Sequence, residues 1–298
     1  MNDFLANPGV QAAVAPFIVA LVIGLLLRRL GVIAAGLAII AGLITTVMLT
    51  TGLAFQPMTS TRKIILGSLC LPFVALLLDW VRGRLPGSSG QATLVTTLTI
   101  MVPALLLVAA VDWVVWPVFA RQEIAEAWPM LARVSLYVGV VGAAFLAMAG
   151  RKGVQGSTAQ AASILALGVG TAVTTMIAAS ALYAQLAFSV TAAVGALLVI
   201  GLFTKALWEP KSGLGHLGAF GLFAAATPLL LIGAAATVYA QLSAWVLLCL
   251  AIIPLVAWWP PVNVERPWLR LVVTGLISLL PVIPAVWLAW RAAGPVSF

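Results

Sequence analysis

Charged side chains are rare inside the apolar runs of this sequence, and Asp112 is the clearest example. It stands within the run Ile100–Phe119 (IMVPALLLVAAVDWVVWPVF). A charged group inside a membrane-spanning helix is costly, and such groups usually mark a pathway for protons, ions or substrates. Asp112 is therefore a candidate carboxylate for coupling transport to protons.

Arg133 is the nearest candidate partner for Asp112. It lies a few residues into the next apolar run, which starts from the same side of the predicted membrane. Asp112 lies about 9–10 Å inside its end of the helix at a rise of about 1.5 Å per residue. Because Arg133 has a similar depth, we expect an Asp112–Arg133 ion pair, which would lower the cost of both charges. Such a pair either fixes a helix hairpin or forms a coupling site.

Asp79 is a second candidate carboxylate, near the opposite membrane surface. It lies close to Arg82 at the end of an apolar run. This position favours a solvated ion pair at the membrane surface, and the functional alternative is a coupling or substrate contact.

Threonines gather in three of the apolar runs. Hydroxyl groups and small residues allow helices to approach closely and to form hydrogen bonds with one another. The alternative is a weakly polar pathway for a small solute, with Thr171, Thr174 and Thr175 as candidate contacts. The three clusters are Thr45, Thr46, Thr50 and Thr51; Thr93, Thr96, Thr97 and Thr99; and Thr171, Thr174 and Thr175.

The residue types needed for catalysis or metal binding are scarce. The chain has seven acidic residues, one histidine (His216) and two cysteines (Cys70 and Cys249), which lack a CxxC spacing. The segment Gly213–Gly218 (GLGHLG) matches GxGxxG, but the dinucleotide-binding fingerprint needs a strand before it. We therefore expect neither an enzyme nor a bound cofactor or metal.

The overall composition predicts that a lipid bilayer surrounds these residues. The chain has 298 residues, of which 63% are hydrophobic and 7% charged. Soluble domains are typically about 45–50% apolar and about 25% charged, so soluble, disordered and disulfide-rich secreted proteins are excluded. The net charge is +8, but basic residues stand singly or in pairs between apolar runs. This is typical of membrane-protein loops and gives no indication of a nucleic-acid partner.

The apolar runs predict an all-α polytopic membrane protein with about ten spans in a single domain, residues 1–298. A bilayer core of about 30 Å requires about 20 apolar helical residues. No predicted loop is long enough for a soluble domain. Tight turns are expected at Tyr183–Leu186 and Tyr239–Leu242, where the same four residues divide two long runs. The predicted spans are 10–27, 32–54, 64–82, 94–118, 129–149, 160–182, 185–207, 217–238, 241–259 and 269–290.

The distribution of basic residues predicts the orientation. Loops after odd-numbered spans hold ten Lys and Arg residues, and the other side holds five. Cytoplasmic loops carry the excess of positive charge. We therefore expect a multi-pass protein of the bacterial cytoplasmic (inner) membrane with both termini in the periplasm.

Two pairs of similar segments suggest internal repeats of helix hairpins. Ala178–Leu186 (AASALYAQL) is similar to Ala234–Leu242 (AAATVYAQL), and Gly87–Ala92 (GSSGQA) is similar to Gly156–Ala161 (GSTAQA). Both pairs relate helices of the same predicted orientation, which indicates a parallel repeat. The alternative is chance similarity between Ala-rich segments.

The sequence is consistent with two functions. The first is a transporter or permease for a small solute, proton-coupled through Asp112. The second is a non-catalytic subunit that scaffolds, anchors or regulates a larger membrane complex, which the scarcity of polar residues in the spans favours. Convergence of Asp112, Arg133 and the threonines on a cavity near the middle of the membrane favours transport. Contacts of these residues between helices without a cavity, together with an exposed flat apolar surface, favour the subunit.

Overall fold

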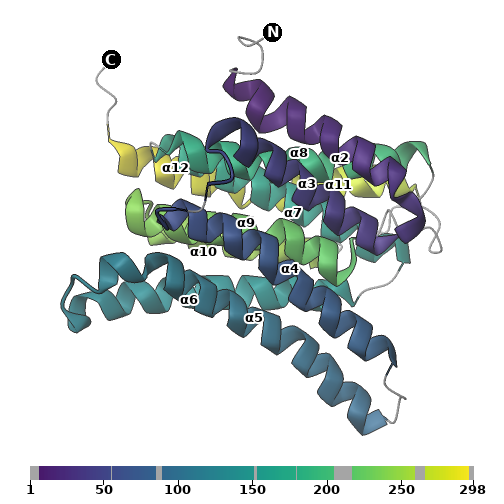
Figure 1. Cartoon of the computed structure of the whole chain (residues 1–298), viewed down its shortest axis with the longest axis horizontal. Helices are drawn as coiled ribbons and strands as arrows, with labels where there is room; N and C mark the ends of the chain where they lie inside the picture. The colour runs from purple at the N-terminus through teal and green to yellow at the C-terminus, as the bar shows by residue number, and fades with distance from the viewer. Residues whose placement is uncertain are drawn as a thin grey trace.

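The computed structural model describes residues 7–54, 56–84, 89–150, 153–178, 180–204, 217–258 and 266–294. Within these ranges every regular element is a helix (Figure 1). Two short helices, η1 (Val10–Val14) and η2 (Arg28–Leu30), flank the first long helix. The others are α2 (Ala15–Leu26), α3 (Val32–Thr50), α4 (Ser60–Arg84), α5 (Ser89–Phe119), α6 (Ile124–Ala149), α7 (Gly153–Ile177), α8 (Ala181–Phe203), α9 (Gly218–Tyr239), α10 (Ala244–Trp258), α11 (Pro267–Leu279) and α12 (Val282–Ala293).

The helices are those of a polytopic membrane protein. In the described part of the chain, eight helical segments are long and apolar enough to cross a bilayer. Two shorter apolar segments, Val10–Leu26 and Ala244–Trp258, lie at the first and ninth predicted spans. Each predicted span overlaps a described helical segment. The last of them comprises α11 and α12, which Pro281 separates because proline cannot continue the hydrogen-bond pattern of a helix.

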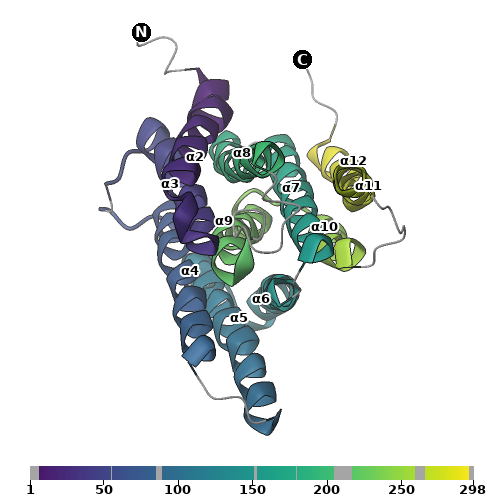
Figure 2. The same ribbon diagram turned by 90° about the vertical axis from the view of Figure 1, so that its right-hand side faces the viewer.

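Helix α9 forms the centre of the bundle, and the other long helices enclose it (Figure 2). Residues 218–237 are all buried, as expected for a helix that is apolar on every face. Gly36 of α3 allows close packing against α9, because a Cβ atom there would overlap the ring of Phe220. The Phe220 ring also contacts Phe73 of α4, with the ring centroids 5.4 Å apart. Small residues of α3 and large residues of α9 thus fit together in the core.

The bundle has two ends, which we name after Tyr239 and Asp79. The end of α9, the start of α4 and the C-terminal part of α5 meet at the Tyr239 end. Helices α4 and α5 extend past most of the other helices at the opposite, Asp79 end (Figures 1 and 2). The basic residues predicted there include Arg151, Lys152, Lys205 and Lys211, which lie outside the described residues, as do Gly87, Ser88 and Gly213–His216.

The turn predicted at Tyr183–Leu186 is wrong. Helix α7 ends at Ile177 and α8 begins at Ala181, so these four residues lie within α8. Ala, Leu and Gln are good helix formers, and the segment from Ala181 onward continues as a helix.

The turn predicted at Tyr239–Leu242 is confirmed. Tyr239 ends α9, Gln241 has a left-handed φ of 53°, and the Leu242 N–H donates to the Ala236 carbonyl at 3.2 Å. The two Tyr-Ala-Gln-Leu segments therefore adopt different conformations, and their similarity gives no structural support to a hairpin repeat.

Candidate functional site

A cavity of about 320 Å³ lies at the Asp79 end, between α4, α5, α6 and α9. Asp79 of α4 lines it together with Thr96 and Thr99 of α5. The end of α6, including Leu146, and Ala219 at the start of α9 complete the wall. We call this space the Asp79 cavity; it combines a carboxylate with two hydroxyl groups.

The backbone positions these polar groups on facing helices. Thr96 and Thr99 are three residues apart on α5, so they share one face of that helix. The Thr99 hydroxyl donates to the Val95 carbonyl at 2.6 Å, which leaves its oxygen lone pairs as acceptors. Asp79 is exposed, five residues before the end of α4. From the sequence we expect Asp79 to pair with Arg82 at the membrane surface. The Arg82 side chain is outside the described part of the structure. The structure places Asp79 on the wall of the cavity.

Hydrogen bonds join four helices at the Tyr239 end, and we call their residues the Tyr239 cluster. The Ser60 hydroxyl donates to the Tyr239 hydroxyl at 2.7 Å, and Tyr239 donates to the Val114 carbonyl at 2.8 Å. Thr61 forms a side-chain hydrogen bond with Tyr183. The first turn of α4 is thereby connected to α5, α8 and α9.

Lys63, in the first turn of α4, adds a cationic contact beside this cluster. Its Nζ donates to the Trp113 carbonyl at 2.8 Å and lies 5.0 Å from the centroid of the indole ring. Residue 117 would normally donate its N–H to this carbonyl, but it is proline and has no N–H. Lys63 therefore satisfies an acceptor that the helix itself leaves open.

Sequence reasoning did not identify the Tyr239 cluster. Two signals were present: Pro117 stands four residues after Trp113, and Tyr183 and Tyr239 begin the two Tyr-Ala-Gln-Leu segments. The similarity of these segments suggested repeats and turns, whereas the tyrosines themselves meet neighbouring residues of α4.

The predicted Asp112–Arg133 ion pair is not formed. Instead, the Ser135 hydroxyl donates to Asp112 Oδ1 at 2.8 Å, and Asp112 is half-buried. Arg133 and Ser135 are two residues apart on α6, which separates them by about 200° around the helix axis. Since Ser135 faces α5, Arg133 points away from it. We expected the pair because the two residues have similar predicted depths in the membrane, but their side chains point in different directions around their helices.

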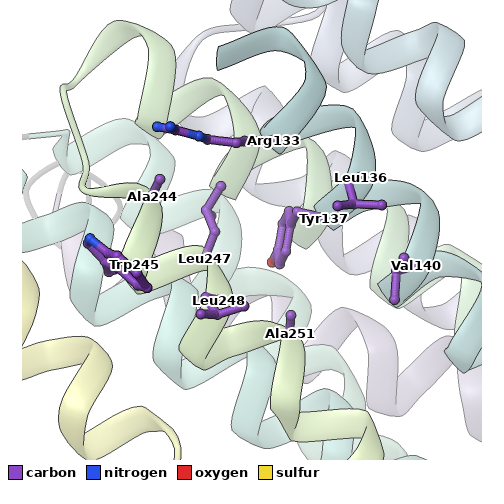
Figure 3. A pocket seen from close by; sticks show the side chains of 9 residues that line it. All are labelled: Arg133, Leu136, Tyr137, Val140, Ala244, Trp245, Leu247, Leu248 and Ala251. Atoms are coloured by element: carbon purple, nitrogen blue, oxygen red, sulfur yellow. The ribbon is translucent and has the colours of Figure 1, made fainter. Parts of the chain in front are cut away.

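Arg133 lies on a different surface, a groove of about 490 Å³ between α6 and α10. Tyr137 and Val140 follow Arg133 on the same face of α6, and Leu248 and Ala251 contribute from α10. Figure 3 shows the Arg133 guanidinium extending away from Tyr137, toward the start of α10. We call this surface the Arg133 groove.

Thr171, Thr174 and Thr175 are fully buried in α7. The hydroxyl of Thr174 donates to the Gly170 carbonyl and that of Thr175 to the Thr171 carbonyl, each at 2.7 Å. The Thr171 hydroxyl has no partner among the described residues. None of the three lines the Asp79 cavity or the Arg133 groove. Bonds within one helix and full burial are what the packing interpretation expects.

The structure thus separates the candidates predicted from the sequence. Asp79 joins Thr96 and Thr99 at a cavity, whereas Asp112 and Arg133 face different helices. No protein-family model and no curated protein matches the chain. Function must therefore be inferred from the sites themselves.

Proposed function

We propose that the chain is a membrane transporter or permease for a small solute and that the Asp79 cavity is its solute site. The observation that carries this proposal is the asymmetry of α4 and α5. Hydrogen bonds hold one end of these helices to α8 and α9, and a polar cavity lies beside their other end. Alternating access requires such a difference between the two ends around a solute site.

The polar groups of the cavity favour a solute that donates hydrogen bonds and carries positive charge. An ionised carboxylate such as Asp79 accepts hydrogen bonds and donates none. Thr99 uses its proton within α5 and can likewise offer its oxygen as an acceptor. A small organic amine matches this set better than an anion does, because an anion would be repelled by Asp79.

Prolines provide the flexibility that the transport cycle requires. Pro72 lies within α4 and Pro103 within α5, each between the Asp79 cavity and the Tyr239 cluster. A proline removes one hydrogen bond of its helix and permits a kink. We propose that α4 and α5 bend at these positions, so that the Tyr239 cluster opens as the Asp79 cavity closes.

Asp112 stays the candidate proton-coupling residue in this proposal. It precedes Trp113, whose carbonyl Lys63 binds, and it accepts a hydrogen bond from Ser135. Protonation would remove the charge that strengthens this bond and so loosen α5 from α6 near the Tyr239 cluster. Asp112→Asn should abolish proton-coupled transport and leave the protein folded.

We also propose ten membrane crossings, with the Tyr239 end toward the periplasm. The excess of basic residues in the loops of the opposite end supports this orientation. Both ends of the described chain support an even number of crossings. The Thr46 hydroxyl, near the end of α3, donates to the Gln11 carbonyl, and α3 leads into the start of α4 at the Tyr239 end. Ala293 of α12 and Ala240 line one cavity at the same end. The Asp79 cavity then faces the cytoplasm.

A binding screen tests the solute site. Thermal unfolding of the purified protein is measured with a panel of small organic amines, neutral solutes and organic anions. A solute at about 100 times its Kd stabilises the protein by about 2.7 kcal/mol. We expect amines to raise the unfolding temperature of the wild type but not that of Asp79→Asn.

Glu123→Gln is the matched control for this screen. It removes the same charge from an exposed position at the start of α6, at the Tyr239 end, and should respond as the wild type does. A binding solute that stabilises Asp79→Asn as strongly as the wild type would show that the cavity is not its site.

Two observations favour the alternative, a non-catalytic subunit of a larger complex. The first is that Asp112, Arg133 and the threonines of α7 do not converge on one cavity. The second is an exposed apolar surface. The parts of α4 and α5 that extend toward the Asp79 end carry exposed apolar side chains, among them Leu77 and Leu94. A partner helix would find an apolar surface there. Purification in a mild detergent followed by mass spectrometry separates the two functions, because a stoichiometric partner protein would favour the subunit.

A further inference from the structure

The Arg133 groove plays no part in the proposed transport cycle. It combines one cationic side chain with an apolar lining. Its edges are exposed apolar side chains, Leu136 and Val140 of α6 and Trp245 and Leu248 of α10. In a membrane these side chains face lipid tails. The long axis of the groove follows two neighbouring helices, which is the direction of an acyl chain in the bilayer.

A single cation stands near one end of this apolar groove. Arg133 is exposed, and its side chain forms no hydrogen bond or ion pair with the described residues. Its side chain extends toward the start of α10 (Figure 3), as long basic side chains do when they reach for the membrane surface. A charged side chain without a partner is costly inside a membrane, so an anionic group beside the Arg133 guanidinium would be stabilising.

We propose that the Arg133 groove binds a membrane phospholipid with an anionic headgroup. The phosphate accepts hydrogen bonds from the Arg133 guanidinium, whose planar fork suits a phosphate. One acyl chain lies along Val140, Leu248 and Ala251. Trp245 stands near the cationic end, where indole rings prefer the headgroup region. Charge complementarity identifies a lipid as the occupant, because the bilayer presents a phosphate and an acyl chain together.

Native mass spectrometry tests this proposal. The protein is reconstituted in nanodiscs of phosphatidylglycerol and phosphatidylcholine, extracted with a mild detergent, and weighed with the lipids that it retains. We expect the wild type to retain phosphatidylglycerol in preference to phosphatidylcholine. Arg133→Gln should lower phosphatidylglycerol retention about tenfold, since the phosphate loses its charge-assisted hydrogen bond.

Two further variants separate the headgroup from the acyl chain. Arg121→Gln removes a charge from an exposed residue that follows α5 at the same end of the bundle, outside the groove, and should retain lipid as the wild type does. Ala251→Phe fills the groove and keeps Arg133, so it should lower the retention of both lipids. The unfolding temperature and elution volume identify any variant that fails to fold.

Three results would contradict the proposal that the Arg133 groove binds an anionic lipid. A wild type that binds both lipids alike would overturn the proposal, and so would an Arg133→Gln variant that keeps its phosphatidylglycerol. A wild type that retains no lipid and has the mass of a dimer or of a complex with another protein would assign the groove to a protein partner. None of these results bears on amine binding at the Asp79 cavity.

Discussion

At the scale of single residues, the contact between Lys63 and the Trp113 carbonyl connects α4 to α5 at the Tyr239 end. Pro117 removes the N–H that would bind this carbonyl within α5. Lys63 of α4 supplies a donor instead, at 2.8 Å. The proline thus converts a hydrogen bond within one helix into a contact between two helices, and that contact can break without unfolding either of them.

This explanation predicts that Lys63 and Pro117 are energetically coupled. Lys63→Met should lower the free energy of unfolding by about 1 kcal/mol, because the Trp113 carbonyl loses its donor. In a Pro117→Ala background the alanine N–H binds the carbonyl, so the same substitution should cost less. A double-mutant cycle measured by thermal unfolding checks this. Equal costs in the two backgrounds would mean that Lys63 does not serve this carbonyl.

Removal of the hydroxyl group should affect stability differently at Tyr137 and at Tyr239. The Tyr137 hydroxyl is buried and has no partner among the described residues, whereas Tyr239 bridges Ser60 and Val114. A buried polar group without a partner costs free energy. Tyr137→Phe should therefore leave the unfolding temperature unchanged or raise it, and Tyr239→Phe should lower it. A marked loss of stability in Tyr137→Phe would reveal a partner for its hydroxyl.

At the scale of helices, the apolar runs predicted where the elements lie but not how they face one another. Length and hydropathy placed a helix at each predicted span, because the bilayer imposes both. The direction of a side chain around its helix depends on the packing of the whole bundle. For this reason the expected pairing of Asp112 and Arg133, which rested on their depth alone, was wrong.

Local sequence similarity also failed at this scale. The two Tyr-Ala-Gln-Leu segments differ in structure because α8 begins before the first, while α9 ends within the second. The Asp79 cavity was not predicted from the sequence, which singled out Asp79 and, separately, a threonine cluster that includes Thr96 and Thr99. That these residues face one another depends on contacts between α4, α5, α6 and α9, which no single helix encodes.

Helix packing around α9 gives a prediction with a matched control. Gly36→Ala should lower the free energy of unfolding by about 1–3 kcal/mol, because the new Cβ atom overlaps the Phe220 ring and overpacking has this typical cost. At Gly195 of α8 nothing lies within 4 Å of an added Cβ atom. Gly195→Ala should be neutral or stabilising by up to about 1 kcal/mol, since alanine is the better helix former. Thermal unfolding of both variants provides the comparison, and equal losses would refute the packing described for Gly36.

At the scale of the whole molecule, the two ends of α4 and α5 differ in what holds them. The Tyr239 cluster ties α4 to three other helices, while the Asp79 cavity separates α4 and α5 from parts of α6 and α9. A transporter must pass between this state and one in which the difference is reversed. Opening of the Tyr239 cluster is therefore an obligatory step of the proposed cycle.

Locking the Tyr239 end tests that step. In a background without Cys70 and Cys249, cysteines replace Ser60 and Tyr239, whose hydroxyl oxygens lie 2.7 Å apart. A short bifunctional thiosulfonate reagent then links them, and a reducing agent releases them. We expect the cross-link to stop solute uptake and reduction to restore it. Uptake at the full rate by the cross-linked protein would show that this end does not open during transport.

The most direct test of the central claim is uptake into proteoliposomes of the amine that best stabilises the purified protein. The wild type and Glu123→Gln should accumulate it within the vesicles. Asp79→Asn, reconstituted in equal amount and with an unchanged unfolding temperature, should lose at least nine-tenths of this uptake, about the effect of one lost charge-assisted hydrogen bond. Uptake by Asp79→Asn at the wild-type rate would contradict the assignment of the cavity, and a wild type that moves no solute would contradict transport itself.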